Sequence, residues 1–448
     1  MKNRLYRSGS IHHKFRIIYI AIPAALVLAA LVALYLLFAN GFFYKRHDIG
    51  AVQRTSGEDI RTVINASPVS ASGLAARTSA LLRTSAQTDP YVVSWYVLPG
   101  SIKSQPALPS EYLLASDQIL LLRSYITADK KDAAKSLSDS IERDFTGENG
   151  YLVPCLKSSD VLSGQNSPFQ TDISYDELPA GTYSFEETVA YLRALLEYYA
   201  KWGSESDWTR INAIAGLLAS DGNLFPEDLT LIGTTPAPVI TGEKSDVVSL
   251  PEDQIASEGS YSGVLLSGLD LEVFRMLAVI DAKYQPLYDK AVEIVSGGYI
   301  SSQLPLFAYA YTQSTGGYTY TSGNATGVDL VSSLKVILHL AEEGKAPAAS
   351  LAWIKEQLYN QGILYKTYDV ITGEAISEEE CTEGYGIILQ IARAADDPNL
   401  FDAALSCTEN HLATKSNSAA VGAIYRNTDS SRIVVYAKDN LETLLGVV

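Results

Sequence analysis

The chain has 448 residues, of which 47% are hydrophobic, a composition typical of a globular protein with one large core or a few smaller ones. It carries 51 acidic and 34 basic residues and a net charge of −17, which argues against a nucleic-acid partner because phosphates need a basic surface. The 3 cysteines show no CxxC spacing and there are only 5 histidines, so we predict no metal site and no cofactor.

The N-terminal segment predicts a membrane anchor. Residues 17–39 contain no charged side chain, and about 20 apolar residues are enough to cross a bilayer. Basic residues are concentrated in residues 1–16, which predicts a cytoplasmic tail there, a single-pass anchor in the cell membrane and an extracellular main domain. A cleaved signal peptide is the alternative, but its apolar region would be only ~7–15 residues long. Residues 40–56 are expected to form a stalk.

From residue 57 to residue 448, pairs of helical patterns are joined by short turns. The expected pairs are 57–67 with 70–85, 109–128 with 130–145, 184–202 with 205–220, 270–278 with 287–295, 329–344 with 348–359 and 379–395 with 398–412, followed by a final helix at 438–448. The first helix of most pairs is the more apolar, so we predict an all-α closed double ring with buried inner helices. The final helix is expected to complete the ring against the first pair. Strand-like aromatic runs occur at 91–98 and 304–311, and two long polar loops at 157–182 and 221–260.

Asp270 is the first candidate for chemistry, because it directly precedes the apolar helical series of its segment. A carboxylate at the start of a core-facing helix can transfer protons. Asp is also a favoured helix cap, so a purely structural role is the alternative.

The chain resembles glycoside hydrolase family 8, in particular the branch found with exopolysaccharide and biofilm systems. The resemblance is strongest from residue 267 onward and weaker over roughly 108–200. It rests on five segments: SGLDLEVFRMLAVIDAKY, GGYISSQLPLFAYAY, VSSLKVILHLAEEG followed by SLAWIKEQL, LYKTYDVITGE and DNLETLLGV. It implies an (α/α)6 toroid with short β-hairpins at its rim, and hydrolysis of a β-linked polysaccharide with inversion. Inversion needs an acid and a base on carboxylates about 6.5–9.5 Å apart.

The resemblance implies that Asp270 is the catalytic base. Members of the family carry a Ser-Glu pair before an apolar helix, where this chain has Ser116-Asp117, with Tyr125 at the matching aromatic position. Asp117 is therefore one candidate for the acid, and Glu111, in an earlier Ser-Glu pair, is the other. Asp is one methylene shorter than Glu, and a misplacement near 1 Å can cost ~10²-fold in rate. A catalytically inactive polysaccharide-binding or scaffold protein is therefore the alternative function.

The resemblance also implies that Glu187, or its neighbour Glu186, holds sugar hydroxyls, although acidic residues are favoured in any first helical turn. Aromatic rings stack on sugars, so some of the 28 tyrosines are expected in a groove, although most aromatic residues are core. The candidates are Tyr299, Tyr309, Tyr311, Tyr365, Tyr368 and Tyr385. Expected partners are the polysaccharide, the membrane and a polysaccharide-synthesis machinery. A polysaccharide lyase, using a tyrosine with His339 or His411, is a weaker alternative.

Overall fold

The computed structural model describes residues 26–32, 35, 44–52, 56–82, 91–98, 108–110, 112–157, 184–219, 263–313, 315–321, 326–427 and 433–448. Glu111 and nearly all of the two polar loops lie outside these residues. Of the predicted membrane segment, only residues 26–32 and Tyr35 are described, and they are helical. Within the described residues, no helix has both the length and the apolar character needed to cross a bilayer. The membrane segment stays a prediction.

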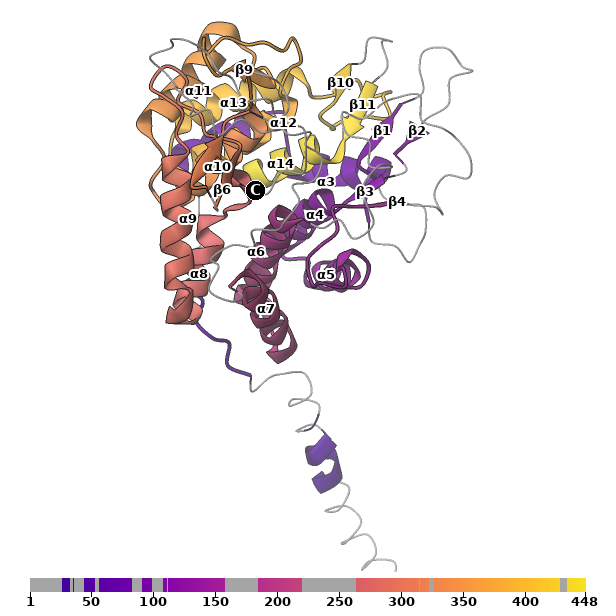
Figure 1. The fold of residues 1–448 in the computed structure, drawn as a ribbon. Coiled ribbons are helices and arrows are strands. Elements are labelled where there is room, and N and C mark those ends of the chain that lie inside the picture. The colour runs from indigo at the N-terminus through magenta and orange to yellow at the C-terminus, as the bar shows by residue number, and fades with distance from the viewer. Residues whose placement is uncertain are drawn as a thin grey trace, which may run out of the picture.

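Six of the described helices, labelled in Figure 1, form a closed inner ring, and five others lie outside it. The inner ring consists of α4 (Ala115–Thr127), α6 (Phe185–Trp202), α8 (Leu271–Ile280), α10 (Leu330–Glu342), α12 (Thr382–Ala394) and α14 (Ala437–Val447). Each contacts the next in this order, and α14 returns to α4. The outer helices are α5 (Lys131–Phe145), α7 (Glu205–Leu218), α9 (Gln285–Gly297), α11 (Ala348–Gln361) and α13 (Pro398–Asn410). This arrangement is the predicted (α/α)6 toroid.

The ring closes where α14, which follows α12 in the ring, meets α4, and α14 also packs against the first helical pair. That pair consists of α2 (Glu58–Ala66) and α3 (Ala71–Arg77), followed by a π-helical turn, η1 (Thr78–Leu82); α2 contacts α13 and α3 contacts α14. Two glycines allow the close approach of α12 and α14. A Cβ atom on Gly386 would lie 2.5 Å from the backbone N of Thr443, and one on Gly446 would lie 2.6 Å from Cβ of Leu389. The predicted closure by the final helix is confirmed.

Short antiparallel strands mark the face of the toroid at which the inner helices begin, which we call the helix-start face. The strand pairs are β3 (Tyr112–Leu114) with β4 (Cys155–Lys157), β8 (Gly327–Asp329) with β9 (Thr367–Asp369), and β5 (Val264–Leu265), β6 (Ala310–Thr312) and β7 (Gly317–Thr319) in one sheet. The largest sheet has the order β10 (Arg426–Asn427), β11 (Ile433–Tyr436), β1 (Trp95–Val97) and β2 (Leu108–Pro109), with Trp95 opposite Tyr436. Of the strand predicted at 304–311, only its end is a strand, β6.

The opposite face, at which the inner helices end, is called the helix-end face. Residues 44–50, within the predicted stalk, pack on this face through hydrogen bonds to α6 and α8 rather than extending away from the domain. The packed chain thus includes Tyr44, which precedes the boundary that the sequence predicted at residue 57.

Candidate active site

Carboxylates gather at the helix-start face because five inner helices carry one at their beginning. Asp117, Glu187, Glu383 and Asp439 lie in the first turns of α4, α6, α12 and α14, and Asp329 caps α10. The partial positive charge of a helix N-terminus stabilises a negative side chain in this position. The fold therefore brings together acidic residues that are far apart in the sequence.

Asp117, the predicted acid, is 1% exposed. Burial raises the pKa of its carboxyl group to about 7, and the nearby Lys438 and Ser94 only partly oppose this effect. Neither carboxyl oxygen has a hydrogen-bond partner of standard geometry among the described residues. Asp117 therefore keeps a transferable proton up to neutral pH, but a substrate could reach it only if the side chains that cover it move.

Glu186 and Glu187 begin α6, where the Ser184 side chain caps the helix by accepting a hydrogen bond from the Glu187 amide. Glu186 is paired with Lys335 of α10, with 3.0 Å between Oε1 and Nζ. Burial, together with the negative charge of Glu186, raises the pKa of the half-buried Glu187 to about 7. Glu187 is thus a second carboxyl group that titrates near neutral pH on this face.

Two lysines join these carboxylates, and the sequence reasoning missed both. Nζ of Lys438 lies 2.8 Å from Oε2 of Glu383. Burial alone would lower the pKa of Lys335, but Glu186, Glu383 and Glu442 outweigh burial and raise it. Lys335 therefore stays charged between α6 and α12. The sequence signal for Lys335 was a single lysine within the apolar run of α10.

Asp270, the predicted base, caps α8. Its Oδ1 accepts hydrogen bonds from the amides of Glu272, at 3.0 Å, and Val273, at 3.2 Å. Its Oδ2 accepts one at 2.9 Å from Nη1 of Arg193. Burial opposes ionisation, but Arg193 and His339 outweigh it and hold the pKa of Asp270 below its usual value. Asp270 is therefore ionised, 4% exposed, and bonded through both oxygens.

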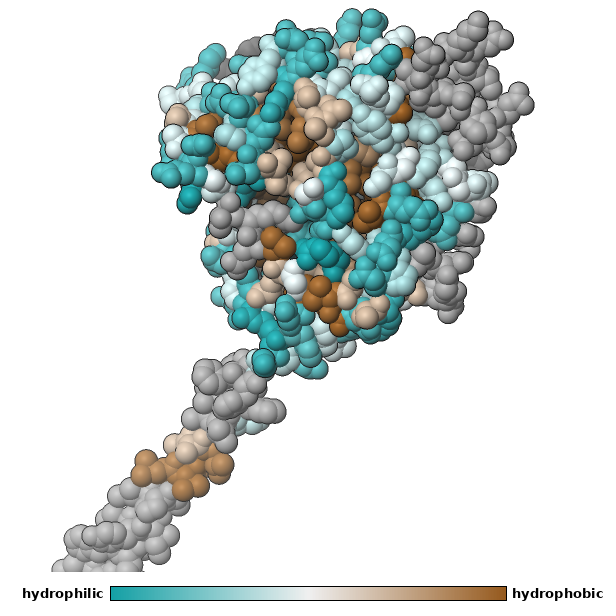
Figure 2. All heavy atoms as spheres, turned by 90° about the vertical axis from the view of Figure 1, so that its left-hand side faces the viewer, coloured by the Kyte–Doolittle hydropathy of each residue, from teal (hydrophilic) through white to brown (hydrophobic). Residues whose placement is uncertain are grey.

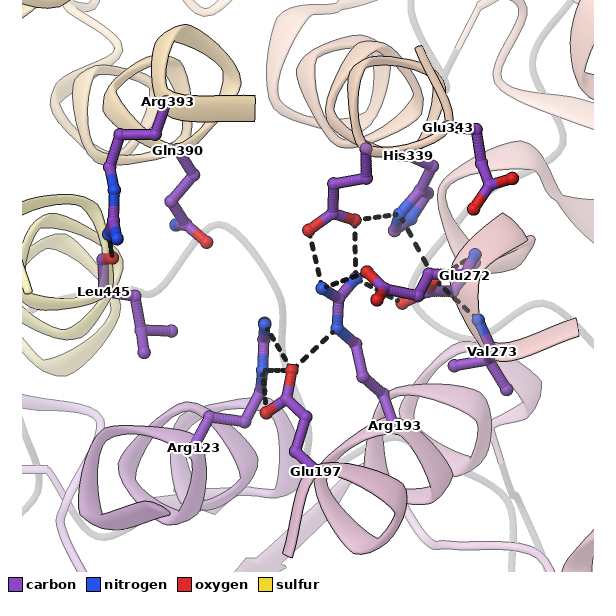
Figure 3. Close-up of polar contacts among 12 residues, drawn as sticks. Arg123, Arg193, Glu197, Glu272, Val273, His339, Glu343, Gln390, Arg393 and Leu445 are labelled. Carbon is purple, nitrogen blue, oxygen red and sulfur yellow. Dashed lines mark hydrogen bonds and ion pairs between the residues drawn. The ribbon is translucent and has the colours of Figure 1, made fainter. Parts of the chain in front are cut away.

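Arg193 is the centre of a buried group of charges (Figure 3). Its guanidinium also contacts Glu197, Glu272 and Glu342, and Glu197 is bound in turn by Arg123 of α4. We call this group the floor network; its members are Arg123, Arg193, Glu197, Asp270, Glu272, His339 and Glu342. His339 adds a hydrogen bond between its Nε2 and the carbonyl of Ser267, at 2.9 Å.

The floor network lies deeper in the ring than the helix-start face. Arg193 is 6 residues beyond Glu187 along α6, which places its backbone ~9 Å further along the helix axis. A short 3₁₀ turn, η5 (Leu266–Gly268), precedes α8 and lies beside the start of α6. A Cβ atom on Gly268 would lie 3.1 Å from Cα of Glu186, so the backbones are in close contact there. Because of η5, Asp270 lies below the level of the other helix starts.

One trio in the floor network has the residue types and spacing of a cation site. The ligand atoms of Asp270, His339 and Glu342 all lie within 4.8 Å of one another. The guanidinium of Arg193 contacts both carboxylates, with 2.9 Å to Asp270 and 2.6 Å to Glu342. The guanidinium of Arg193 therefore already supplies a positive charge to this trio.

The structure corrects the sugar-binding role predicted for several tyrosines. Tyr368 is 1% exposed and packs edge-to-face on Trp353, with ring centroids 5.0 Å apart, so it is a core residue. Tyr311 is also buried, beside Tyr318. Tyr125 lies near the end of α4, and therefore near the helix-end face. Tyr309 is half-buried next to β6 on the helix-start face, and its sugar-binding role stays a prediction.

No family model matches the sequence, and no curated protein matches it either. Solved structures do match the fold. An α-amylase from Clostridium perfringens is 21% identical, with a TM-score of 0.61 over 88% of this chain and 99% of its own. A reducing-end-xylose releasing exo-oligoxylanase is 11% identical, with a TM-score of 0.51 over 88% and 95% of the chains. PssZ from Listeria monocytogenes is 13% identical, with a TM-score of 0.50 over 88% and 98%. The chain therefore has a fold like that of glycoside hydrolase family 8, as predicted.

Proposed function

We propose that this protein hydrolyses glycosidic bonds of a β-linked polysaccharide with inversion. The observation that carries the proposal is that two carboxyl groups on the helix-start face, Asp117 and Glu187, have pKa values raised to about 7, beside the ionised Glu383–Lys438 pair. Hydrolysis of this kind needs a protonated acid and an ionised base near working pH. The fold shared with an α-amylase and an exo-oligoxylanase supports the same reaction class.

Asp117 is the proposed acid, and Glu111 stays the alternative. The base has two candidates. Asp270 is the residue that the family resemblance implies, but both of its oxygens are already bonded, so it has little capacity to activate water. Glu187 is half-buried on the same face as Asp117, and this partial exposure favours it as the base.

The proposal includes a membrane anchor at residues 17–39, with the toroid outside the cell and acting on a secreted polysaccharide beside the machinery that makes it. Apolar side chains in the described part of that segment support this anchor, since Leu26, Leu28 and Leu31 are 66%, 63% and 58% exposed (Figure 2). Exposed leucine side chains are unfavourable in contact with water and favourable in contact with lipid.

Purified full-length protein in detergent would be incubated with a β-glucan, a xylan and starch, and new reducing ends would be measured. We expect cleavage of a β-linked polymer, and NMR of the first product is expected to show the α-anomer, because inversion reverses the β configuration. Cleavage that yields the β-anomer would exclude inversion, and cleavage of starch alone would exclude the β-linked substrate.

A catalytically inactive polysaccharide-binding protein is the second candidate. The specific observation in its favour is that Asp270 is fully bonded while Asp117 is 1% exposed, so neither carboxylate of the implied pair is open to substrate. Affinity electrophoresis in polysaccharide gels would distinguish the two. Retarded migration without new reducing ends for any polymer would favour the binding protein.

A further inference from the structure

Residues 44–50 lie on the helix-end face, and their contacts with α6 are specific. The hydroxyl groups of Tyr44 and Tyr199 are 2.7 Å apart, and the backbone N–H of His47 donates to the same Tyr199 hydroxyl at 2.9 Å. Nη1 of Arg46 donates to the carbonyl of Ala200 at 2.7 Å. Both partners lie in the last turn of α6, at the end opposite Glu187.

Further contacts join the same segment to two other helices. The His47 ring stacks on Trp208 of α7, with centroids 4.2 Å apart and planes inclined by 18°. Nη1 of Arg275, from α8, donates to the carbonyl of Gly50 at 2.8 Å. Figure 1 shows this indigo segment at the lower end of α8, where the N-terminal part of the chain leaves the domain. Three helices therefore fix the position at which the chain enters the toroid.

This fixed entry point is close to the end of the predicted membrane segment. Only four residues separate Ala39 from Tyr44, so a fully extended chain places Tyr44 within ~18 Å of the membrane end. Glu187 precedes Tyr199 by 12 residues, which places it ~18 Å further along α6. The catalytic carboxylates are thus on the side of the toroid away from the anchor.

The helix-end face itself carries a repeated pairing of lysine with an aromatic ring. The pairs, with the distance from Nζ to ring centroid, are Lys130 with Tyr125 at 5.7 Å, Lys201 with Trp202 at 5.4 Å, Lys283 with Tyr284 at 4.8 Å and Lys345 with Tyr288 at 5.6 Å. Each pair lies at or beside a turn that joins an inner helix to its outer partner, in four consecutive hairpins. Three of these lysines are also paired with carboxylates, Lys201 with Asp129, Lys283 with Asp281 and Lys345 with Glu343, and the Tyr284 ring is buried. The turns therefore offer aromatic side chains of the kind enriched at the lipid headgroup level, with much of the lysine charge balanced by carboxylates.

We infer that the helix-end face lies against the headgroup layer of the bilayer and that the helix-start face points away from it. The inference rests on the proposed membrane anchor. It restricts the substrate class: the reacting polysaccharide reaches the carboxylates from the side away from the membrane, as a free or wall-associated polymer. A sugar chain still attached to a lipid at the bilayer surface would lie on the wrong side of the toroid.

Fluorescence quenching in vesicles tests the orientation. The full chain would be reconstituted into phosphatidylcholine–phosphatidylglycerol vesicles, with Cys155→Ser as background and one probe at Ala282→Cys on the helix-end face or at Thr372→Cys beyond β9. With a headgroup-labelled nitroxide lipid, we expect loss of fluorescence for the probe at 282 and unchanged fluorescence for the probe at 372. Equal or reversed quenching in protein that floats with the vesicles would overturn the inference. Protein that fails to float would instead contradict the proposed anchor.

A variant of the docking contacts tests their part in the orientation. Tyr199→Phe combined with Trp208→Ala removes the hydroxyl and the ring that hold Tyr44 and His47, and we expect the difference in quenching between the two probes to decrease. Tyr359→Phe is the matched control, because that exposed tyrosine donates to the Asn399 carbonyl, on α13, away from the segment 44–50. An unchanged difference in the double variant would show that these contacts do not set the orientation.

Discussion

Oδ2 of Asp270 lies 2.9 Å from Nη1 of Arg193, and both side chains are only 6% exposed. A buried ion pair costs desolvation energy, so it persists only where geometry and further hydrogen bonds offset that cost. Here the offset comes from Glu197, Glu272 and Glu342, which contact the same guanidinium. The pair therefore belongs to the structure of the ring interior, whatever else Asp270 does.

Replacing Arg193 tests that role. Arg193→Met leaves several buried carboxylates without their cation, and breaking a buried pair in this way typically costs about 3–5 kcal/mol. We expect a lower free energy of unfolding by urea denaturation, or insoluble protein. Arg61→Met, at an exposed position of α2, is the control and should change little. Equal stability of the two variants would show that the floor network contributes little.

The identity of the base is decided by two substitutions. We expect Glu187→Gln to lower the rate by about 10²–10⁴-fold, the usual contribution of acid–base catalysis, with little change in thermal unfolding. We expect Asp270→Asn to unfold at a lower temperature, because a hydrogen bond to a charged group contributes about 1.5–3 kcal/mol, and to keep more activity than Glu187→Gln. Asp281→Asn, an exposed cap at the end of α8, is the control. Full stability of Asp270→Asn combined with complete loss of activity would restore Asp270 as the base.

The activity should depend on pH in a narrow bell centred near pH 7. Burial raises the pKa of Asp117 to about 7, and the acid must be protonated, so activity falls as pH rises above that value. Burial and Glu186 raise the pKa of Glu187 to about 7, and a base must be ionised, so activity falls as pH decreases below it. The alkaline limb therefore reports on the acid and the acidic limb on the base.

The alkaline limb can be assigned with a charge variant. Lys438 opposes the effect of burial on the pKa of Asp117, so Lys438→Met should raise that pKa further and shift the alkaline limb to higher pH. Lys415→Met, an exposed lysine outside the site, is the control. If Lys438→Met left the alkaline limb at the same pH, Asp117 would not be the acid.

His339 should make stability depend on pH. Burial lowers the pKa of His339, but Asp270 and Glu342 outweigh burial and raise it above the usual value. The stabilisation is therefore fully present below pH ~6.5, the pKa of an unfolded histidine, and is lost as pH rises through the folded pKa. We expect His339→Gln to destabilise the protein more at pH 6 than at pH 9, measured by urea unfolding. The same loss at both pH values would contradict a charged His339.

The ring could be predicted from the sequence because it depends on local patterns. The more apolar first helix of most predicted pairs is a helix of the inner ring. Asp270 begins its helix, as predicted. The depth of Asp270 could not be predicted, because it is set by the 3₁₀ turn η5 and by Arg193, which is 77 positions away in the sequence. An arginine within an apolar helical run such as LRALLEYY was the signal that a buried acidic partner exists.

The tyrosines show the same limit for the site. Periodicity identifies an aromatic residue near a helix start or strand, but it does not distinguish a ring packed on a tryptophan, as in Tyr368, from a half-exposed ring such as Tyr309. That difference depends on contacts between segments that are distant in the sequence. Composition alone therefore could not identify which tyrosines are exposed enough to contact a sugar.

The close contact of Gly386 with α14 links the packing of the ring to the electrostatics of the candidate site. The last helix, Ala437–Val447, supplies the final member of the ring, and Lys438 at its start binds Glu383 and lowers the pKa of Asp117. Lys438 therefore acts on Asp117 only when α14 is packed against α12. A larger side chain at Gly386 would push the two helices apart and move this cation away from the helix-start face.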